Sequence, residues 1–541
     1  MKNSFKALCA GVALGFASII PAQAANFILV NTDPAGVGFN DATPATPVGG
    51  NPGTTVGEQR LIAYSRALSL WGSILKSDVS ITVLGSFAPL TCTATGGTLA
   101  QAGAWNVELN FPHAPIANTW YHSALANSLA GFDLYVGDPA ADGGAIIDGA
   151  DIVANFNGNL GQPGCIEGST WYYGLDSHAD TAHGQTDFLN VFMHELSHGL
   201  GFSNFLNEQT GARFLGLNDV YMNFQLDNAT GKLWSQMSAA EIRAAAIRDG
   251  QEVWSGANVT AGAPLVLGPA TLLSVDSPAT VAGEYDFLGG ASFGGVATSA
   301  AFTGDVATGS PVDGCAAMSG VAGKIAIVRR GTCGFAVKAK NAQVAGATAV
   351  IIANNAAGGG PVGMGGADPT VTIAAISVGT DQGTTLINAG GFHANGFVQS
   401  ATRLAGADAN GRVRLYSPTT VALGSTASHF DVVAEPSLLM EPAITPLLHA
   451  STNVDLTAAL FQDIGWKTEL TMPACGPVAG NPGVSDIGDV YAGPVFLCAD
   501  SAKNKGNFQA CVAQHLGKLV GQGAITGNTK GSLGSCYAGL K

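Results

Sequence analysis

Positive charge is scarce in this sequence: only 23 of 541 residues are Lys or Arg, against 38 Asp or Glu, and the net charge is −15. A chain with so few basic residues is a poor partner for nucleic acids or anionic membranes, because both are bound through clustered positive charge. Beyond residue 24 the sequence also lacks an apolar run of the about 20 residues that a membrane-spanning helix needs. We therefore expect no nucleic-acid partner and no membrane span.

The first 24 residues have the pattern of a secretory signal peptide. Lys2 and Lys6 precede an apolar stretch, and Ala22-Gln23-Ala24 fits the small-residue site at which such signals are cleaved. Removing this segment takes away Cys9 and leaves eight of the nine cysteines, an even number that favours disulfide bonds in an exported chain. The sequence predicts a secreted or periplasmic, monomeric protein of several domains.

Residues 192–202 contain the motif H-E-x-x-H within an apolar run. In a helix, His194 and His198 lie one turn apart on the same face, where two imidazoles can bind one zinc ion. Glu195 then stands beside the metal without binding it, and it can take a proton from a metal-bound water and pass it to a leaving amine. Chance occurrence in a buried helix is the alternative, although two His and a Glu are poor core residues unless paired.

The residues around the motif favour a helix. Thr186 can cap its start, and Asp187 suits the positive end of the helix dipole. Gly199 and Gly201 allow the backbone to stop and turn after the second His.

A catalytic zinc site needs a third protein ligand and leaves a fourth position for water. The compact extension of the motif would place a His at position 204, which is Asn204 here. A Glu about twenty residues downstream is another known solution, but the sequence has Asp219 in that region. An isolated His429 occurs much further along, shortly before Met440. Asp219 and Glu241 stay open as rival ligands.

Four pieces of the sequence together resemble the leishmanolysin-like metzincin peptidases: H-E-L-S-H-G-L-G-F at 194–202, S-H-F-D at 428–431, L-L-M-E-P at 438–442 and L-F-Q-D-I-G-W at 460–466. The resemblance implies an α+β catalytic domain, with a mixed sheet and an active-site helix, formed by residues 25–264 and 404–468. It also implies that His194, His198 and His429 bind zinc, that Glu195 is the catalytic acid/base and that Met440 is the Met-turn residue. In that family an insertion separates the helix glycine from the third His, which accounts for Asn204.

Residues 265–403 are expected to form a separate domain. The order within 323–355 is strand, loop, amphipathic helix, Gly-Ala turn and strand, and it closely resembles the protease-associated (PA) domain. The resemblance implies an inserted α/β domain that stands beside a peptidase active site as a lid or substrate-contact surface; a rigid spacer is the alternative. Cys315 and Cys333 fall inside it, and we expect them to pair.

Local patterns also predict strands at 27–30, 79–83, 151–156 and 170–175, and helices at 58–75 and 120–129. Four aspartates among glycines raise structural Ca²⁺ as an alternative to a solvated loop, although the EF-hand spacing is missing: Asp138, Asp142, Asp148 and Asp151. Residues 469–541 contain four cysteines and an apolar pattern at 508–520, which predicts a small disulfide-stapled appendage with one helix.

The first functional hypothesis is a secreted zinc-dependent endopeptidase that hydrolyses protein or peptide substrates with a zinc-activated water and Glu195 as general acid/base. A second is a catalytically silent exported adhesion or polymer-binding protein on a metalloprotease fold. A third is a zinc amidase acting on a non-protein substrate. The intact set of three His and Glu195 favours an enzyme, because a silent fold need not keep its general base.

Overall fold

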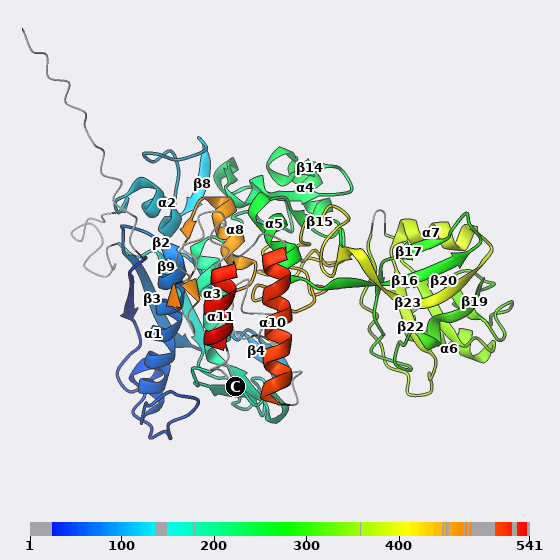
Figure 1. The fold of residues 1–541 in the computed structure, drawn as a ribbon, viewed down its shortest axis with the longest axis horizontal. Coiled ribbons are helices and arrows are strands. Elements are labelled where there is room, and N and C mark those ends of the chain that lie inside the picture. Colours follow the sequence, from blue (N-terminus) through cyan, green and yellow to red (C-terminus); the bar gives the residue numbers. More distant parts are fainter. Residues whose placement is uncertain are drawn as a thin grey trace, which may run out of the picture.

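The computed structural model describes residues 24–135, 149–176, 179–356, 359–445, 448, 454–468, 471–472, 476–477, 504–521 and 527–537. Residues 1–23 of the predicted signal peptide lie outside these residues, as do Cys475, Cys498 and three of the four aspartates of the calcium hypothesis, Asp138, Asp142 and Asp148. The described chain forms a larger body and a separate lobe, joined by a long pair of strands (Figure 1). Among the described helices, none has both the length and the apolar character needed to cross a membrane.

The body is built on a four-stranded mixed sheet. Its strands are β1 (Phe27–Asn31), β3 (Ile81–Ala88), β9 (Ile152–Asn157) and β6 (Ala100–Ala104), in the order β1-β3-β9-β6. The first three are parallel, and β6 runs antiparallel to β9. Alternating burial in β9 turns Ile152, Ala154 and Phe156 toward the core, as expected for a strand with helices on one face.

Two helices, α1 (Val56–Ile74) and α3 (Phe188–Leu200), pack together in the body core. Helix α1 begins with a capping box, in which Thr55 accepts a hydrogen bond from the backbone of Glu58 and the Glu58 side chain accepts from the backbone of Thr55. The Trp71 indole donates to the Met193 carbonyl at 3.2 Å, and the Tyr64 and Phe192 ring centroids are 4.0 Å apart. These contacts fix α3 against α1.

The segment after the lobe returns to the same core. Most of helix α8 (Thr457–Ile464) is buried, and strand β24 (Lys467–Thr468) pairs with β2 (Leu75–Lys76). The Trp466 indole donates to the Leu200 carbonyl at the end of α3, at 2.8 Å. One hydrophobic core therefore contains residues from both sides of the lobe, from Ala25 to Leu267 and from Leu404 to Trp466.

The lobe contains an eight-stranded sheet in the order β17-β16-β23-β19-β20-β21-β22-β18. Strands β19 to β22 are parallel, and they are β19 (Thr303–Thr308), β20 (Ile325–Arg329), β21 (Ala349–Ala353) and β22 (Ala374–Val378). The remaining strands are antiparallel: β16 (Pro269–Ser277), β17 (Gly283–Tyr285), β18 (Phe287–Leu288) and β23 (Gly391–Leu404). Helices α6 (Phe335–Val344) and α7 (Thr380–Asn388) cross over between them. Cys315 and Cys333 are joined by a disulfide bond.

Shorter elements complete the body. They are β4 (Cys92–Thr93), β5 (Gly96–Gly97), β7 (Val107–Glu108), β8 (Thr119–His122), α2 (Ser123–Ala130), β10 (Thr170–Tyr172), β11 (Gln185–Asp187), β12 (Asn218–Asp219), β13 (Gln225–Asp227), β14 (Lys232–Leu233), α4 (Ala239–Ala245), β15 (Glu252–Trp254) and α5 (Ala257–Val266). Cys92 is bonded to Cys165. Near the C-terminus, helices α10 (Lys505–Gly521) and α11 (Gly527–Tyr537) lie against each other, and Cys511 of α10 is disulfide-bonded.

Two local expectations need correction. The predicted helix over 120–129 is strand β8 followed by α2, because residues 119–122 pair with both β7 and β12 before the helix begins. The strand predicted over 170–175 ends at Tyr172, where its pairing with β11 stops.

Candidate active site

Helix α3 places both motif histidines in the core. Its N-cap is Asp187, not the expected Thr186: the Asp187 carboxylate accepts the Asn190 amide at 2.8 Å. Thr186 is still extended in β11 and pairs with Trp171, so the helix cannot begin there. An acidic cap also suits the positive end of the helix dipole.

Two glycines let α3 fit tightly and end sharply. A Cβ on Gly199 would stand 2.4 Å from the Ile152 side chain, so a larger residue would push α3 off strand β9. Gly201 has a φ of +132°, which residues with side chains rarely adopt, and it turns the chain away after the helix. The helix therefore presents its last turn, with His198, to the following segments.

The structure brings His194, His198 and His429 together, although His429 is more than two hundred residues away in sequence. Their Nε2 atoms form a nearly equilateral triangle, with distances of 3.1 Å for His194–His429, 3.2 Å for His198–His194 and 3.2 Å for His198–His429. All three residues are buried. Within the described part of the chain, these three form the group of His, Cys, Asp or Glu residues arranged as metal ligands.

The second nitrogen of each ring fixes its protonation state. The Nδ1 atoms donate to three backbone carbonyls: His194 to Leu439 at 2.7 Å, His198 to Phe202 at 2.8 Å and His429 to Ser425 at 3.0 Å. A carbonyl oxygen can only accept, so each Nδ1 carries the proton and each neutral Nε2 turns a lone pair toward the other two. Three lone pairs meeting at one buried point repel one another unless a cation lies between them.

The dimensions of the triangle fit zinc. Three nitrogens at about 2.0–2.1 Å from a tetrahedral ion are about 3.3–3.4 Å apart, close to the observed separations of 3.1–3.2 Å. Burial lowers the pKa of His194 to about 3 and that of His198 to about 4, and it holds the pKa of His429 well below its usual value. The rings are thus neutral, as metal ligands must be. Backbone carbonyls that hold the outer nitrogens are the usual partners of zinc-binding His.

Glu195 is the next residue on α3 and is 7% exposed. Burial raises its pKa to about 8, and the backbone N–H of Ala102 in β6 partly opposes that rise. A carboxyl group with a pKa near neutrality can both accept and donate a proton at pH 7.

Met440 lies in a buried turn beside the triad. Its neighbour Leu439 accepts the His194 Nδ1 proton, the Glu441 amide donates to the Leu438 carbonyl at 3.1 Å, and the Phe430 amide donates to the Met440 carbonyl at 2.8 Å. The Asp455 carboxylate in turn accepts the Leu439 amide at 2.5 Å. No motif singled out Asp455 in the sequence, yet it orients the peptide that holds His194.

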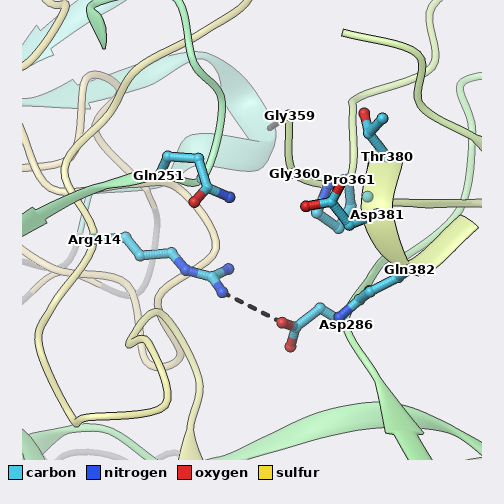
Figure 2. A pocket seen from close by; sticks show the side chains of 11 residues that line it. Gln251, Asp286, Gly359, Gly360, Pro361, Thr380, Asp381, Gln382 and Arg414 are labelled. Carbon is cyan, nitrogen blue, oxygen red and sulfur yellow. Dashed lines mark hydrogen bonds and ion pairs between the residues drawn. The ribbon is translucent and has the colours of Figure 1, made fainter. Parts of the chain in front are cut away.

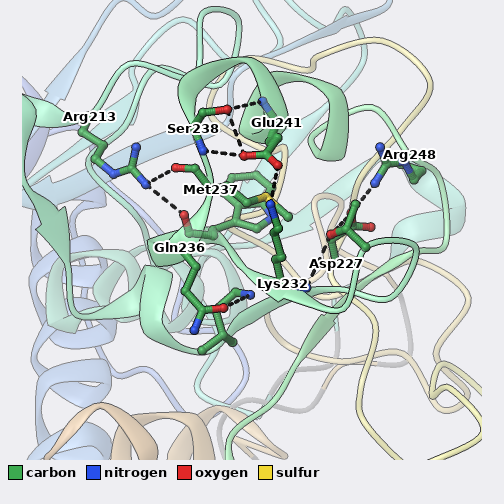
Figure 3. Close-up of polar contacts among 11 residues, drawn as sticks. Arg213, Asp227, Lys232, Gln236, Met237, Ser238, Glu241 and Arg248 are labelled. Atoms are coloured by element: carbon green, nitrogen blue, oxygen red, sulfur yellow. Dashed lines mark hydrogen bonds and ion pairs between the residues drawn. The ribbon is translucent and has the colours of Figure 1, made fainter.

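The rival ligands are engaged elsewhere. Asp219 accepts the amides of Phe205 and Met222, at 2.8 and 2.9 Å, and so shapes the loop after α3. Glu241 is on the surface, where it caps α4 through Ser238 and pairs with Lys232 at 2.5 Å (Figure 3). Neither belongs to the buried group of His ligands.

The calcium hypothesis can be tested only at Asp151, its one described member. The Asp151 carboxylate is buried and accepts hydrogen bonds from Thr82 and Asn127, and nothing in the described residues supports a calcium site.

The triad opens into a cleft of about 700 Å³. One wall is the segment 97–102 leading into β6, the end strand of the body sheet, which sequence patterns did not predict. The opposite wall combines the approach to His429 with the residues that follow Met440, namely 423–425 and 441–444. Glu195, His194, His198 and His429 all line this cleft.

Comparison with known proteins identifies one part of the chain. The sequence model of the PA domain family matches residues 302–386, which confirms the PA domain expected in the lobe. The search of curated proteins gives no match for this chain.

Among solved structures, a zinc aminopeptidase from Bacillus subtilis is 18% identical with a TM-score of 0.18, over 37% of this chain and 45% of that chain. An aminopeptidase from Aneurinibacillus sp. strain AM-1 is 16% identical with a TM-score of 0.13, over 34% of this chain and 42% of that chain. This chain thus spans less than half the length of either enzyme, and likeness at these TM-scores carries no argument about fold or activity.

Proposed function

We propose that this protein is a secreted zinc-dependent endopeptidase of the leishmanolysin-like metzincin type, with an inserted PA domain. The observation that carries the proposal is the triangle of three buried Nε2 lone pairs with Glu195 beside it. The H-E-x-x-H helix, the turn at Gly201, the distant His429 and the buried Met440 turn support the metzincin type. The disulfides Cys92–Cys165 and Cys315–Cys333, and the disulfide-bonded Cys511, suit an exported protein.

In the proposed reaction, the protein binds the metal, orients the three imidazole rings and moves a proton. When bound, zinc lowers the pKa of a water to about 7 and polarises the scissile carbonyl. The three His would hold the ion through Nε2, and the carbonyls of Leu439, Phe202 and Ser425 keep the rings in the tautomer that this requires. Glu195 takes the proton of the attacking water and returns it to the leaving nitrogen. Its burial keeps bulk water from competing for that proton.

The end strand β6 supports cleavage within a polypeptide. β6 pairs with β9 along one edge, and its approach lines the catalytic cleft. An extended substrate can add to such an edge through main-chain hydrogen bonds, without offering a free terminus. The Ala102 amide of β6 interacts with Glu195, so this strand lies beside the proposed general acid/base.

The test combines metal analysis with blocked substrates. We expect one zinc ion per chain, and hydrolysis of casein and of a quenched fluorescent peptide whose N-terminus is acetylated and C-terminus amidated. Cleavage of free-amine peptides alone would replace the endopeptidase by an aminopeptidase. A zinc-free protein without hydrolytic activity would favour the silent binding protein instead.

A further inference from the structure

The body and the lobe touch at few points beyond their connecting strands. Strands β16 and β23 join them, with Pro269 opposite Leu404. The Gly360 amide of the lobe donates to the Asp249 carbonyl of the body at 2.7 Å. Two cavities of about 200 and 450 Å³ lie between the body and the lobe, and Arg414 and Asp286 line both.

Arg414 reaches across this gap from the body. Its Nη2 lies 3.5 Å from the Asp286 carboxylate of the lobe, and Figure 2 shows the pair spanning the cavity. The Arg414 side chain is 15% exposed, and its charge also faces the body carboxyls of Asp249 and Asp431. Asp286 has a second partner, Arg403 at 2.6 Å, at the end of β23.

The backbone of Arg414 belongs to the strand-like segment next to the third His. The Arg414 carbonyl accepts the Asp431 amide at 3.0 Å. Two residues further along the chain, the Tyr416 amide donates to the His429 carbonyl at 2.9 Å. On the other side, the Trp254 amide of β15 donates to the Val413 carbonyl at 2.8 Å. The segment 413–416 therefore lies between β15 and the residues that carry His429.

We propose that Arg414 is a positioning residue that ties the inserted lobe to the His429 segment, so that the docking of the lobe and the geometry of the three His are coupled. Its side chain pairs with Asp286 of the lobe, and its backbone carbonyl accepts a hydrogen bond from the segment that carries His429. Among the described residues this is the one ion pair between the body and the lobe, and two cavities lie beside it. Its loss therefore frees the lobe to move and weakens the pairing of 413–416 with 427–431. The identity of the ion at the triad, but not the coupling itself, rests on the proposed function.

The test compares two arginines that share one carboxylate. In the full-length protein, Arg414→Gln and Arg403→Gln each remove a cation from Asp286, but only Arg414 belongs to the segment paired with His429. We expect Arg414→Gln to weaken zinc binding about tenfold in a chelator competition, the range seen when groups behind metal ligands are lost. Arg403→Gln should stay within about twofold of the wild type, and Arg414→Lys should recover part of the loss because it keeps the charge.

Hydrogen exchange of the metal-free protein gives an independent readout. The amides of Tyr416 and Asp431 should lose protection in Arg414→Gln and keep it in Arg403→Gln. Unchanged protection and zinc affinity in Arg414→Gln, or equal losses in both variants, would overturn the coupling. A wild-type protein that binds no zinc would refute the proposed function, while the exchange comparison would still decide this inference.

Discussion

Replacing His429 by Ala tests the candidate zinc site at the ligand that is furthest away in sequence. The substitution removes one corner of the triangle and leaves the Nε2 atoms of His194 and His198 3.2 Å apart on α3. The backbone pairing of this segment does not depend on the ring, because the Tyr416 amide donates to the His429 carbonyl. We therefore expect the variant to fold, with zinc held by two protein ligands instead of three.

The size of the effect follows from the energy per ligand. Structural zinc sites with four protein ligands bind with about 10–16 kcal/mol, which is roughly 2.5–4 kcal/mol for each ligand. Loss of one ligand should therefore raise the Kd for zinc about 10²–10³-fold. Peptide hydrolysis should be abolished at zinc concentrations that saturate the wild type, and the PA domain should stay folded, since it has its own core.

The assay is zinc affinity by chelator competition, together with hydrolysis of the doubly blocked peptide. Asp219→Asn and Glu241→Gln are the matched controls, since both were rival ligands and both keep the shape of the side chain. Each should retain zinc, because Asp219 serves the amides of Phe205 and Met222 and Glu241 caps α4. Full zinc occupancy in His429→Ala, with metal lost in either control, would refute the three-His site.

Three further predictions follow from the same structure. Glu195→Gln should keep zinc, as Glu195 is no ligand, but lower kcat about 10²–10⁴-fold; near-normal turnover would remove Glu195 from the mechanism. Cys315→Ser should destabilise the lobe by about 2–5 kcal/mol in thermal or denaturant unfolding, and an unchanged transition would show that the Cys315–Cys333 bond contributes nothing. Glu252 is fully buried, and burial raises its pKa to about 8, so the folded state keeps a proton that the unfolded state releases above about pH 4.5. Stability should then fall by up to about 1.4 kcal/mol per pH unit between these two values, and Glu252→Gln should flatten that slope in urea titrations at several pH values.

Sequence patterns predicted the helix of the candidate site because the residues that define it lie close together in the chain. The spacing of His194 and His198 and the two glycines that follow them lie within eight residues, and α3 has the expected end at Gly201. The start was placed one residue early, since Thr186 and Asp187 are both good caps and only the pairing of β11 with β10 decides between them.

The end strand β6 could not be predicted from its own residues. Its sequence, Ala100-Gln101-Ala102-Gly103-Ala104, lacks the β-branched and aromatic side chains that favour strands. It is extended because it pairs residue by residue with β9, from Ala100 opposite Phe156 to Ala104 opposite Ile152. Such pairing depends on tertiary structure, so a strand that lines the cleft of the candidate site has no local sequence pattern.

The third His illustrates a different limit. Residues near His429 form no motif by themselves, and resemblance to a family was needed to select it over Asp219 and Glu241. In the structure, its ring is oriented by the Ser425 carbonyl four residues earlier, just as His198 is oriented by Phe202 and His194 by Leu439.

All three orienting acceptors are backbone atoms, and this explains what the sequence can and cannot reveal about the site. A backbone carbonyl is available whatever side chain the residue carries, so Leu439, Phe202 and Ser425 need no particular identity to hold the rings. What each needs is a backbone conformation, and only unusual conformations constrain residue type. Gly201, with a φ of +132°, precedes the Phe202 carbonyl that accepts from His198, and Gly424, with a φ of +78°, precedes the Ser425 carbonyl that accepts from His429. Two of the three orienting carbonyls therefore follow a glycine whose backbone conformation constrains the residue type. The turn that delivers Leu439 is instead held by two carboxylates: Asp455 accepts the Leu439 amide at 2.5 Å, and Glu441 accepts the Leu438 amide at 2.8 Å. Neither contact forms a recognisable local pattern, because a carboxylate that accepts a backbone amide is common in proteins.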